Sequence, residues 1–376
     1  MKLKLLLLFI IFTGSLLFSE SLTLWVSWEG LSFFEEKARI FNENTGNNVE
    51  ILFVPEMEEK LITSIKTDNF PDIALIKDVY SGYLSQLNTL HKVTNEDLEQ
   101  LGTFRKKDLD VFTADGEIVA IPYYADIQVA FVNQSLLRDI HYELSFDYST
   151  DDLREIKEKL GDNEIVPVAW DFMSPYVFYP FAVHGSELID KNGKLQMNTE
   201  SLAETISSVK ELFDKGLFER YERGALVEKF SSNKIAIILQ GSYLSPTFEQ
   251  NNVKFDIFPF PVMNEKRIKG LIDAKGFVIL NSKKYETALE FLNFLYDSSI
   301  SYCEKYYKVP LWTEPDSKKL INLRTILEES QYMEQKADFQ RMYFRVMRIV
   351  LQSVYSGTMS IDESLQSAQK FVNKNW

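Results

Sequence analysis

The stretch DGEIVAIPYYADIQVAFVNQSLL, Asp115 to Leu137, sets a polar segment, PYYAD, between two apolar runs. An Asp-Gly pair opens the first run and the second run follows Asp126 directly, a pattern typical of a pair of strands. Burying a carboxylate without a partner costs several kcal/mol. Asp126 is therefore expected either to be exposed or to be satisfied by a polar group that arrives from elsewhere.

Strand and helix patterns alternate on both sides of this stretch. Short apolar or β-rich runs predict strands at 22–28, 48–54, 71–76, 165–170, 234–241, 255–261 and 275–280. Apolar residues at helical spacing predict helices at 31–46, 58–67, 151–161 and 201–218, with further helices up to Trp376. Wholly apolar runs such as 71–76 suit the middle of a parallel sheet. The fold class predicted is α/β.

The length of 376 residues is more than twice that of a typical domain, so two lobes are expected. The chain contains no internal repeat, no low-complexity tract and no flexible linker. The lobes must then be joined by ordered crossings of the backbone.

Composition excludes several classes of function. The single cysteine, Cys303, cannot form an intramolecular disulfide, and the three histidines are too far apart for a His/Cys metal motif. The formal net charge of −14 does not suit a nucleic-acid partner, which needs a basic surface. Motifs for dinucleotide, phosphate, serine-hydrolase and zinc-protease chemistry are absent from the sequence. We expect no enzyme activity, no catalytic residues, no metal and no cofactor.

The first residues, MKLKLLLLFIIFTGSLLFSES, have two lysines before an apolar core, the pattern of a secretory signal peptide. We expect cleavage after Ser19 or Ser21, with an uncleaved anchor as the alternative. Because no cysteine lies near the cleavage site, a lipid anchor attached there is not expected. The mature protein is predicted to be periplasmic or extracellular.

Aromatic residues are abundant, with 18 Tyr, 28 Phe and 5 Trp, and carboxylates accompany them at several predicted strand ends. Aromatic faces stack on the C–H faces of sugar rings, and carboxylates accept hydrogen bonds from sugar hydroxyls. This combination favours a carbohydrate ligand.

Several segments, in this order, resemble the extracellular solute-binding proteins of sugar ABC transporters, most closely the maltose/maltodextrin-binding group. They are LTLWVSW at 22–28, PDIALIKDVYSGYLSQLNTLHKV from Pro71, the stretch from Asp115 to Leu137, SPYVFYP at 174–180, VEKFSSNKIAIILQGSY at 227–243 and YSGTMSIDESLQSAQKFV at 355–372. The resemblance covers nearly the whole mature chain.

This resemblance implies a two-lobed periplasmic-binding-protein fold of the class II type, with a ligand cleft between the lobes. It divides the chain into a signal peptide (1–21), an N-terminal lobe (22–124 plus 271–315) and a C-terminal lobe (128–270 plus 316–376). Hinge crossings are expected near 125–127, 270 and 315. At the first of these, the resemblance implies that a sugar hydroxyl satisfies the carboxylate of Asp126.

Acidic residues at the expected cleft follow from the same resemblance. Asp126 matches an acidic ligand-binding position, as does Glu29, which follows Trp28 at the end of the first strand. Asp78 matches a third such position, with a helix N-cap as the alternative role. The arginine that the family places beside this aspartate is Val79 here, and Tyr123 and Tyr124 are equally suited to packing at the hinge.

Aromatic candidates are Tyr176, which matches a stacking tyrosine, and Tyr243 and Phe344, which take the positions of tryptophans. Phe344 is almost as well suited to a core role, since its helix is strongly apolar. The glutamate that the family places near Tyr176 is Ser174, and a further tryptophan position falls on Leu75 or Ile76. The ligand therefore need not be maltose.

Strand and loop ends add Trp170, Asp171, Lys275 and Trp312 as further candidates, whereas Trp25 is expected in the core. The predicted ligand-binding set is Trp28, Glu29, Asp78, Asp126, Trp170, Tyr176, Tyr243, Lys275 and Phe344.

The function expected from this resemblance is capture of a disaccharide or short oligosaccharide, including maltodextrin-like ones, by hinge closure. The expected partners are the sugar and the permease subunits of an ABC importer, and the protein is expected to be a monomer. Two alternatives stay open. The same fold could bind a peptide, a polyamine or a metal chelate, or the chain could be a secreted glycoside hydrolase that uses Asp126 and Asp171.

Overall fold

The computed structural model describes residues 20–86, 90–161, 164–185 and 187–376. The predicted signal peptide thus lies, except for its last two residues, outside the described residues. Within the described ranges, no helix combines the length and the apolar character needed to cross a membrane.

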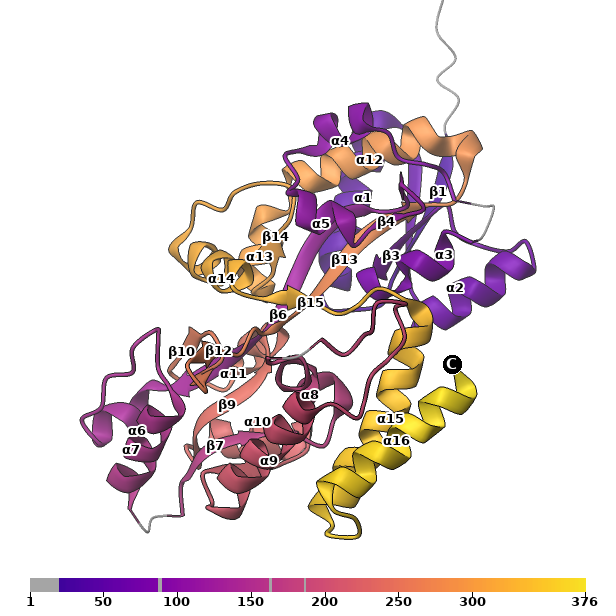
Figure 1. Cartoon of the computed structure of the whole chain (residues 1–376). Helices are drawn as coiled ribbons and strands as arrows, with labels where there is room; N and C mark the ends of the chain where they lie inside the picture. The colour runs from indigo at the N-terminus through magenta and orange to yellow at the C-terminus, as the bar shows by residue number, and fades with distance from the viewer. Residues whose placement is uncertain (1–19, 87–89, 162–163, 186) are drawn as a thin grey trace, which may run out of the picture.

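Strands of two lobes join in one large mixed sheet (Figure 1). The strands of the chain are β1 (Ser21–Val26), β2 (Asn48–Phe53), β3 (Ile73–Lys77), β4 (Thr113–Ala114), β5 (Glu117–Ile118), β6 (Ile121–Asn133), β7 (Val166–Trp170), β8 (Phe218–Arg220), β9 (Ile235–Gly241), β10 (Phe255–Phe258), β11 (Val262–Met263), β12 (Lys266–Arg267), β13 (Leu271–Ile279), β14 (Val309–Pro310) and β15 (Gln331–Tyr332).

Helices cover both faces of this sheet. They are α1 (Leu31–Thr45), α2 (Met57–Lys66), α3 (Ser81–Leu84), α4 (Asn95–Leu101), α5 (Lys106–Asp110), α6 (Gln134–Asp139), α7 (Thr150–Leu160), α8 (Pro175–Ala182), α9 (Glu200–Asp214), α10 (Arg223–Ser231), α11 (Ser245–Gln250), α12 (Tyr285–Asp297), α13 (Ile300–Tyr306), α14 (Lys318–Glu328), α15 (Ala337–Tyr355) and α16 (Ile361–Asn375), with short 3₁₀ turns η1 (Asp78–Tyr80), η2 (Ser242–Leu244) and η3 (Ser282–Lys284). The predicted α/β class is confirmed.

The order of the main strands is β2-β1-β3-β13-β6-β9-β7-β8. Parallel pairs form each outer part: β1 with β2 and β3 in the N-terminal lobe, and β7 with β8 and β9 in the C-terminal lobe. The two central strands, β13 and β6, run antiparallel to each other and join the lobes. Each lobe is therefore an α/β unit built on a shared central strand pair.

Strand β6 is a single continuous element of 13 residues, all of them buried. The prediction of two strands around PYYAD was therefore wrong. Pro122 made that segment look like a break, because proline cannot donate a ladder hydrogen bond. The structure accommodates it at a register shift, where Gly276 opposes Pro122 and Lys275 opposes Tyr124.

The chain passes between the lobes at three neighbouring strand positions. The first half of β6 pairs with β13, and the second half, from Gln128, pairs with β9. Ile127 of β6 lies opposite Ile272 of β13, which in turn lies beside Tyr332 of β15. We place the third crossing at β15, after α14, since the ring of Trp312 still contacts those of Tyr123 and Tyr296; the crossing expected near 315 stays a prediction.

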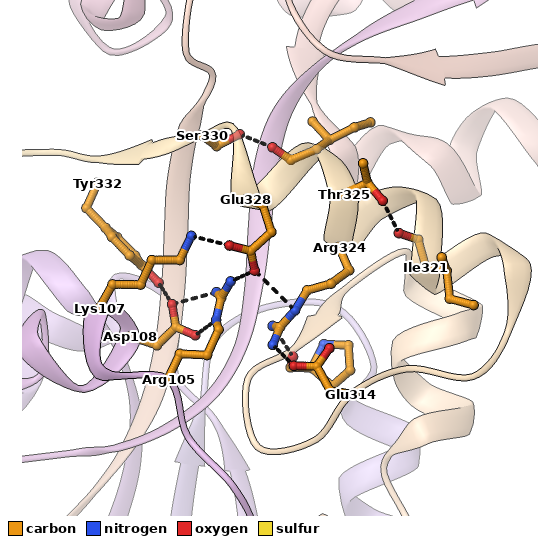
Figure 2. A network of polar contacts seen from close by, with 12 residues as sticks. Arg105, Lys107, Asp108, Glu314, Ile321, Arg324, Thr325, Glu328, Ser330 and Tyr332 are labelled. Atoms are coloured by element: carbon orange, nitrogen blue, oxygen red, sulfur yellow. Dashed lines mark hydrogen bonds and ion pairs between the residues drawn. The ribbon is translucent and has the colours of Figure 1, made fainter.

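A polar network attaches the third crossing to the N-terminal lobe (Figure 2). The buried carboxylate of Asp108 in α5 accepts hydrogen bonds from Arg105 and, at 2.7 Å, from the hydroxyl of Tyr332 in β15. Glu328, at the end of α14, contacts Arg105 and Lys107. Glu328 and Tyr332, just before and within the third crossing, are thus bound to residues of the N-terminal lobe.

The apolar core does not divide at the hinge. One cluster contains the interior of the N-terminal lobe and continues into residues of the C-terminal lobe, including Leu226, Phe230 and Phe248. A second cluster fills the other face of the C-terminal lobe, where α8, α9, α15 and α16 lie. Packing therefore connects the lobes along one face.

Candidate functional site

Asp126 lies in β6 at the level of the crossings, opposite Asp273 of β13. Its residue is only 5% exposed. Lys275 Nζ donates to Asp126 Oδ2 at 2.9 Å, and Lys308 Nζ donates to Asp126 Oδ1 at 2.6 Å. Two ammonium groups from distant parts of the chain therefore satisfy this carboxylate, and a further hydrogen bond from a sugar hydroxyl stays a prediction.

The ion pairs around Asp126 form a chain of five charges. Lys275 also pairs with Asp273 at 2.9 Å, and Lys308, which is fully buried, also contacts the carboxylate of Glu29. Burial by itself acts to raise the pKa of Asp126, but Lys275 and Lys308 outweigh it and hold that pKa below its ordinary value. The cluster thus holds three carboxylates and two ammonium groups.

Asp78 lies directly after β3, at the start of η1, and is fully buried. Gln335 Nε2 donates to Asp78 Oδ2 at 3.0 Å, while Asp78 Oδ1 has no hydrogen-bond partner among the described residues. Burial, reinforced by the negative charge of Asp273, raises the pKa of Asp78 to about 7. Gln335 follows the third crossing, so this bond joins the N-terminal lobe to the connecting segment.

Two aromatic rings of the predicted set lie under cations. The half-buried Trp28 has the ammonium nitrogens of Lys275 and Lys77 over its ring, 5.4 Å and 5.8 Å from the centroid. The half-buried Tyr243 of η2 has the Arg223 guanidinium 4.8 Å from its centroid. Trp28 belongs to the N-terminal lobe and Tyr243 to the C-terminal lobe.

Tyr176, in the first turn of α8, is the third half-buried ring. Gln128 Nε2 donates to its backbone oxygen at 3.2 Å and so anchors α8 to the crossing strand. Burial raises the pKa of Tyr176 well above its ordinary value, and the negative charges of Asp273, Asp126 and Asp78 raise it further. Carboxylates of the crossing strands and of the N-terminal lobe therefore raise the pKa of a tyrosine in the C-terminal lobe.

Trp170 and Phe344 stand apart from this cluster. Trp170 is fully buried, with its ring 4.3 Å from that of Phe181, so its assignment to the site is corrected to a core role. Every residue of β7 is buried, so its sequence does not reveal which face Trp170 occupies. Phe344 packs in α15 against the core of the C-terminal lobe, and no described contact joins it to the charged cluster.

Other candidates take structural roles. Asp171 pairs with Arg220 at 2.9 Å, and the ring of Trp312 stacks on that of Tyr123 at 5.2 Å. Tyr123 and Tyr124 are fully buried in the first half of β6, which agrees with the packing role also expected for them from the sequence.

Sequence reasoning missed Lys308, Asp273, Gln335, Lys77 and Arg223. Asp273 and Lys275 are two residues apart in a strand, which places both side chains on one face, and this spacing could have signalled an ion pair. Lys308 carried no such signal, because its partner Asp126 lies 182 residues away in the sequence.

Two α/β lobes, three crossings and a charged aromatic cluster at the crossings define a two-lobed binding protein. A sequence profile described as bacterial extracellular solute-binding protein matches residues 27–299, and the chain belongs to this family.

Similar proteins are found at low sequence identity. An extracellular solute-binding protein from Staphylococcus aureus, solved in complex with maltose, aligns with a TM-score of 0.77 and 15% identity over 94% of this chain and 97% of that one. Proteins of Brucella abortus and Brucella suis, named only as binding proteins, are 24% identical over 286 residues, which are 70% of this chain and 68% of theirs.

Proposed function

We propose that this chain is the exported substrate-binding subunit of an ABC importer and that it captures a disaccharide or short oligosaccharide for a membrane permease. The observation that supports the proposal is that groups of both lobes border the charged residues of the crossing strands: Lys275 lies over the ring of Trp28, and the negative charges of Asp273, Asp126 and Asp78 act on Tyr176. A ligand that contacts both sides favours the closed arrangement by its differential contacts.

A carbohydrate fits the chemistry of this cluster. Among the described residues, the ring of Tyr176 has no stacked ring or cation, so its face can receive a sugar. Polar groups with spare hydrogen-bonding capacity lie near it, including the unpartnered Asp78 Oδ1 and Gln335 Oε1. The maltose complex of the Staphylococcus aureus protein, which has the same fold, supports a saccharide as the ligand class.

Hydrolysis by the pair Asp126 and Asp171 does not fit. A general acid needs a carboxyl group that holds a proton near neutral pH. The pKa of Asp126 is lowered, and its two oxygens are bound to lysines. Asp171, the proposed second carboxylate, is paired with Arg220. We therefore propose binding without chemistry on the ligand.

Calorimetry of the purified protein against neutral and acidic oligosaccharides, peptides and polyamines tests this proposal. Micromolar binding of a saccharide, with peptides and polyamines inactive, is expected. Preference for a peptide or a polyamine would replace the proposal.

Tyr176→Leu provides a second test, because it removes the stacking face but keeps an apolar side chain. We expect about three- to tenfold weaker saccharide binding and little change in melting temperature. Tyr142→Leu, at a half-buried tyrosine of the loop after α6, is the matched control and should bind as the unmodified protein does. Equal affinity in all three proteins would remove Tyr176 from the site.

A further inference from the structure

The carboxylates that a neutral sugar would use are largely occupied by the protein itself. Asp126 binds Lys275 and Lys308, Asp273 binds Lys275, and Glu29 binds Lys308. A sugar hydroxyl that donates to one of these carboxylates would share it with a charge-assisted bond that is already formed. Asp126 and Asp273 therefore have less spare acceptor capacity than carboxylates without an ion pair.

Two further positive charges lie at the proposed site. Lys77 and Arg223 both lie over aromatic rings of the proposed site, and neither has an ion-pair partner among the described residues. Lys77 ends β3 directly opposite Lys275 of β13. Like charges opposite each other across a strand pair are unfavourable, and Lys77 forms no ion pair among the described residues, whereas Lys275 is paired with Asp126 and Asp273.

These cations also occupy the ring faces that a neutral sugar would stack on. Trp28 carries two ammonium groups over its ring, and Tyr243 carries a guanidinium. The ring of Tyr243 also lies against Gly241, where an added Cβ would approach three ring atoms within 3.0 Å. A ligand that reaches Tyr243 therefore meets Arg223.

We infer that the ligand is an acidic saccharide, an oligosaccharide that carries a carboxylate or sulfate group and binds Lys77 and Arg223. This inference rests on the proposed function and specifies the class of sugar. Guanidinium and ammonium groups form strong, charge-assisted hydrogen bonds with such oxygen anions. Lys77 comes from the N-terminal lobe and Arg223 from the C-terminal lobe, so a ligand with two anionic groups would neutralise one cation on each side.

Calorimetry with trisaccharides of equal length tests the inference. The probes are trigalacturonate, a sulfated trisaccharide and neutral maltotriose. We expect at least about tenfold tighter binding of one of the two acidic probes than of maltotriose. The acidic probe that binds identifies the anionic group as carboxylate or sulfate.

Two variants connect this preference to the named residues. Lys77→Met and Arg223→Met remove charge but keep side-chain length, and each should weaken binding of the acidic trisaccharide at least about fivefold. Lys229→Met and Arg345→Met are the matched controls, since Lys229 lies over Tyr221 and Arg345 over Phe371 without facing the charged cluster. They should leave the affinity unchanged.

The outcomes separate this inference from the proposed function. Equal or tighter binding of maltotriose, or an unchanged affinity in both test variants, would overturn the acidic saccharide while leaving a sugar-binding protein. Binding of a peptide or polyamine and of no saccharide would overturn both.

Discussion

Asp126 is held by two buried lysines, and its removal would leave both charges without their shared partner. Breaking a buried ion pair by removing one partner costs about 3–5 kcal/mol. We expect Asp126→Ala to lower the free energy of unfolding by that amount, as measured by urea denaturation.

Asp110→Ala is the control for this prediction, because Asp110 forms an exposed pair with Lys106. Exposed pairs contribute less than about 1 kcal/mol. Similar losses in the two variants would show that the Asp126 cluster is not a stabilising network. A large loss at Asp126 also means that weaker ligand binding in this variant would not by itself identify a contact.

Asp78 should give the protein a measurable pH dependence. Its pKa in the folded state is about 7, raised by burial and by Asp273 from an ordinary value of 3.8. The folded state then holds this proton more tightly than the unfolded state does. The stabilisation is fully present below about pH 4 and is lost as the pH rises through about 7.

The side chain of Asn in Asp78→Asn cannot titrate, so this variant should lack the pH-dependent stabilisation that Asp78 provides. Relative to the variant, the unmodified protein should lose on the order of 2 kcal/mol of unfolding free energy between about pH 5 and about pH 8. Urea denaturation of both proteins at the two pH values measures the difference. His184, whose pKa is lowered by burial, contributes equally to both proteins and cancels. Parallel pH profiles would contradict the assignment.

The resemblance predicts a crossing at Asp126, but the sequence does not reveal the ion-pair partners of this residue. The pattern around residue 126 is local, whereas Lys275 and Lys308 reach it through the pairing of β13 and β14 with β6. Trp170 was misassigned for a related reason, since an apolar strand buried on both faces offers no alternation to read.

The backbone next to β13 must pass very close to the backbone of the shared strand β6. Gly270 precedes β13, and a Cβ at this position would lie 2.3 Å from the backbone oxygen of Gln128. We expect Gly270→Ala to destabilise the protein by about 1–3 kcal/mol, because backbone atoms on both sides must shift. Thermal denaturation measures the loss.

Gly224→Ala is the matched control in α10, where an added Cβ meets nothing within 4 Å. Alanine replaces glycine in a helix with a gain of about 0.5–1 kcal/mol, so this variant should be slightly more stable. Destabilisation of equal size in both variants would contradict the steric explanation.

Elements were predicted well where their periodicity is local, as for α1, α7 and the parallel strands β1, β2, β3, β7 and β9, whereas strand β8 was not predicted. The two lobes followed from length and from the resemblance. The continuous β6 could not be read from sequence, because the register shift that accommodates Pro122 depends on Gly276 in a distant strand.

Because one apolar cluster continues from the N-terminal lobe into the C-terminal lobe, the two lobes should unfold cooperatively. We expect a single thermal transition, with calorimetric and van't Hoff enthalpies in agreement. Tryptophan fluorescence, near-ultraviolet dichroism and far-ultraviolet dichroism should give coincident curves. Two separated transitions would show that each lobe unfolds by itself.

The three crossings lie side by side at one level of a single sheet, at Ile127, Ile272 and Tyr332. Hydrogen bonds between adjacent strands resist sliding and twisting of one lobe against the other. Bending about a line through the three positions changes only a few backbone angles. Opening and closing should therefore follow nearly one path, so that any solute enters and leaves by the same side of the molecule.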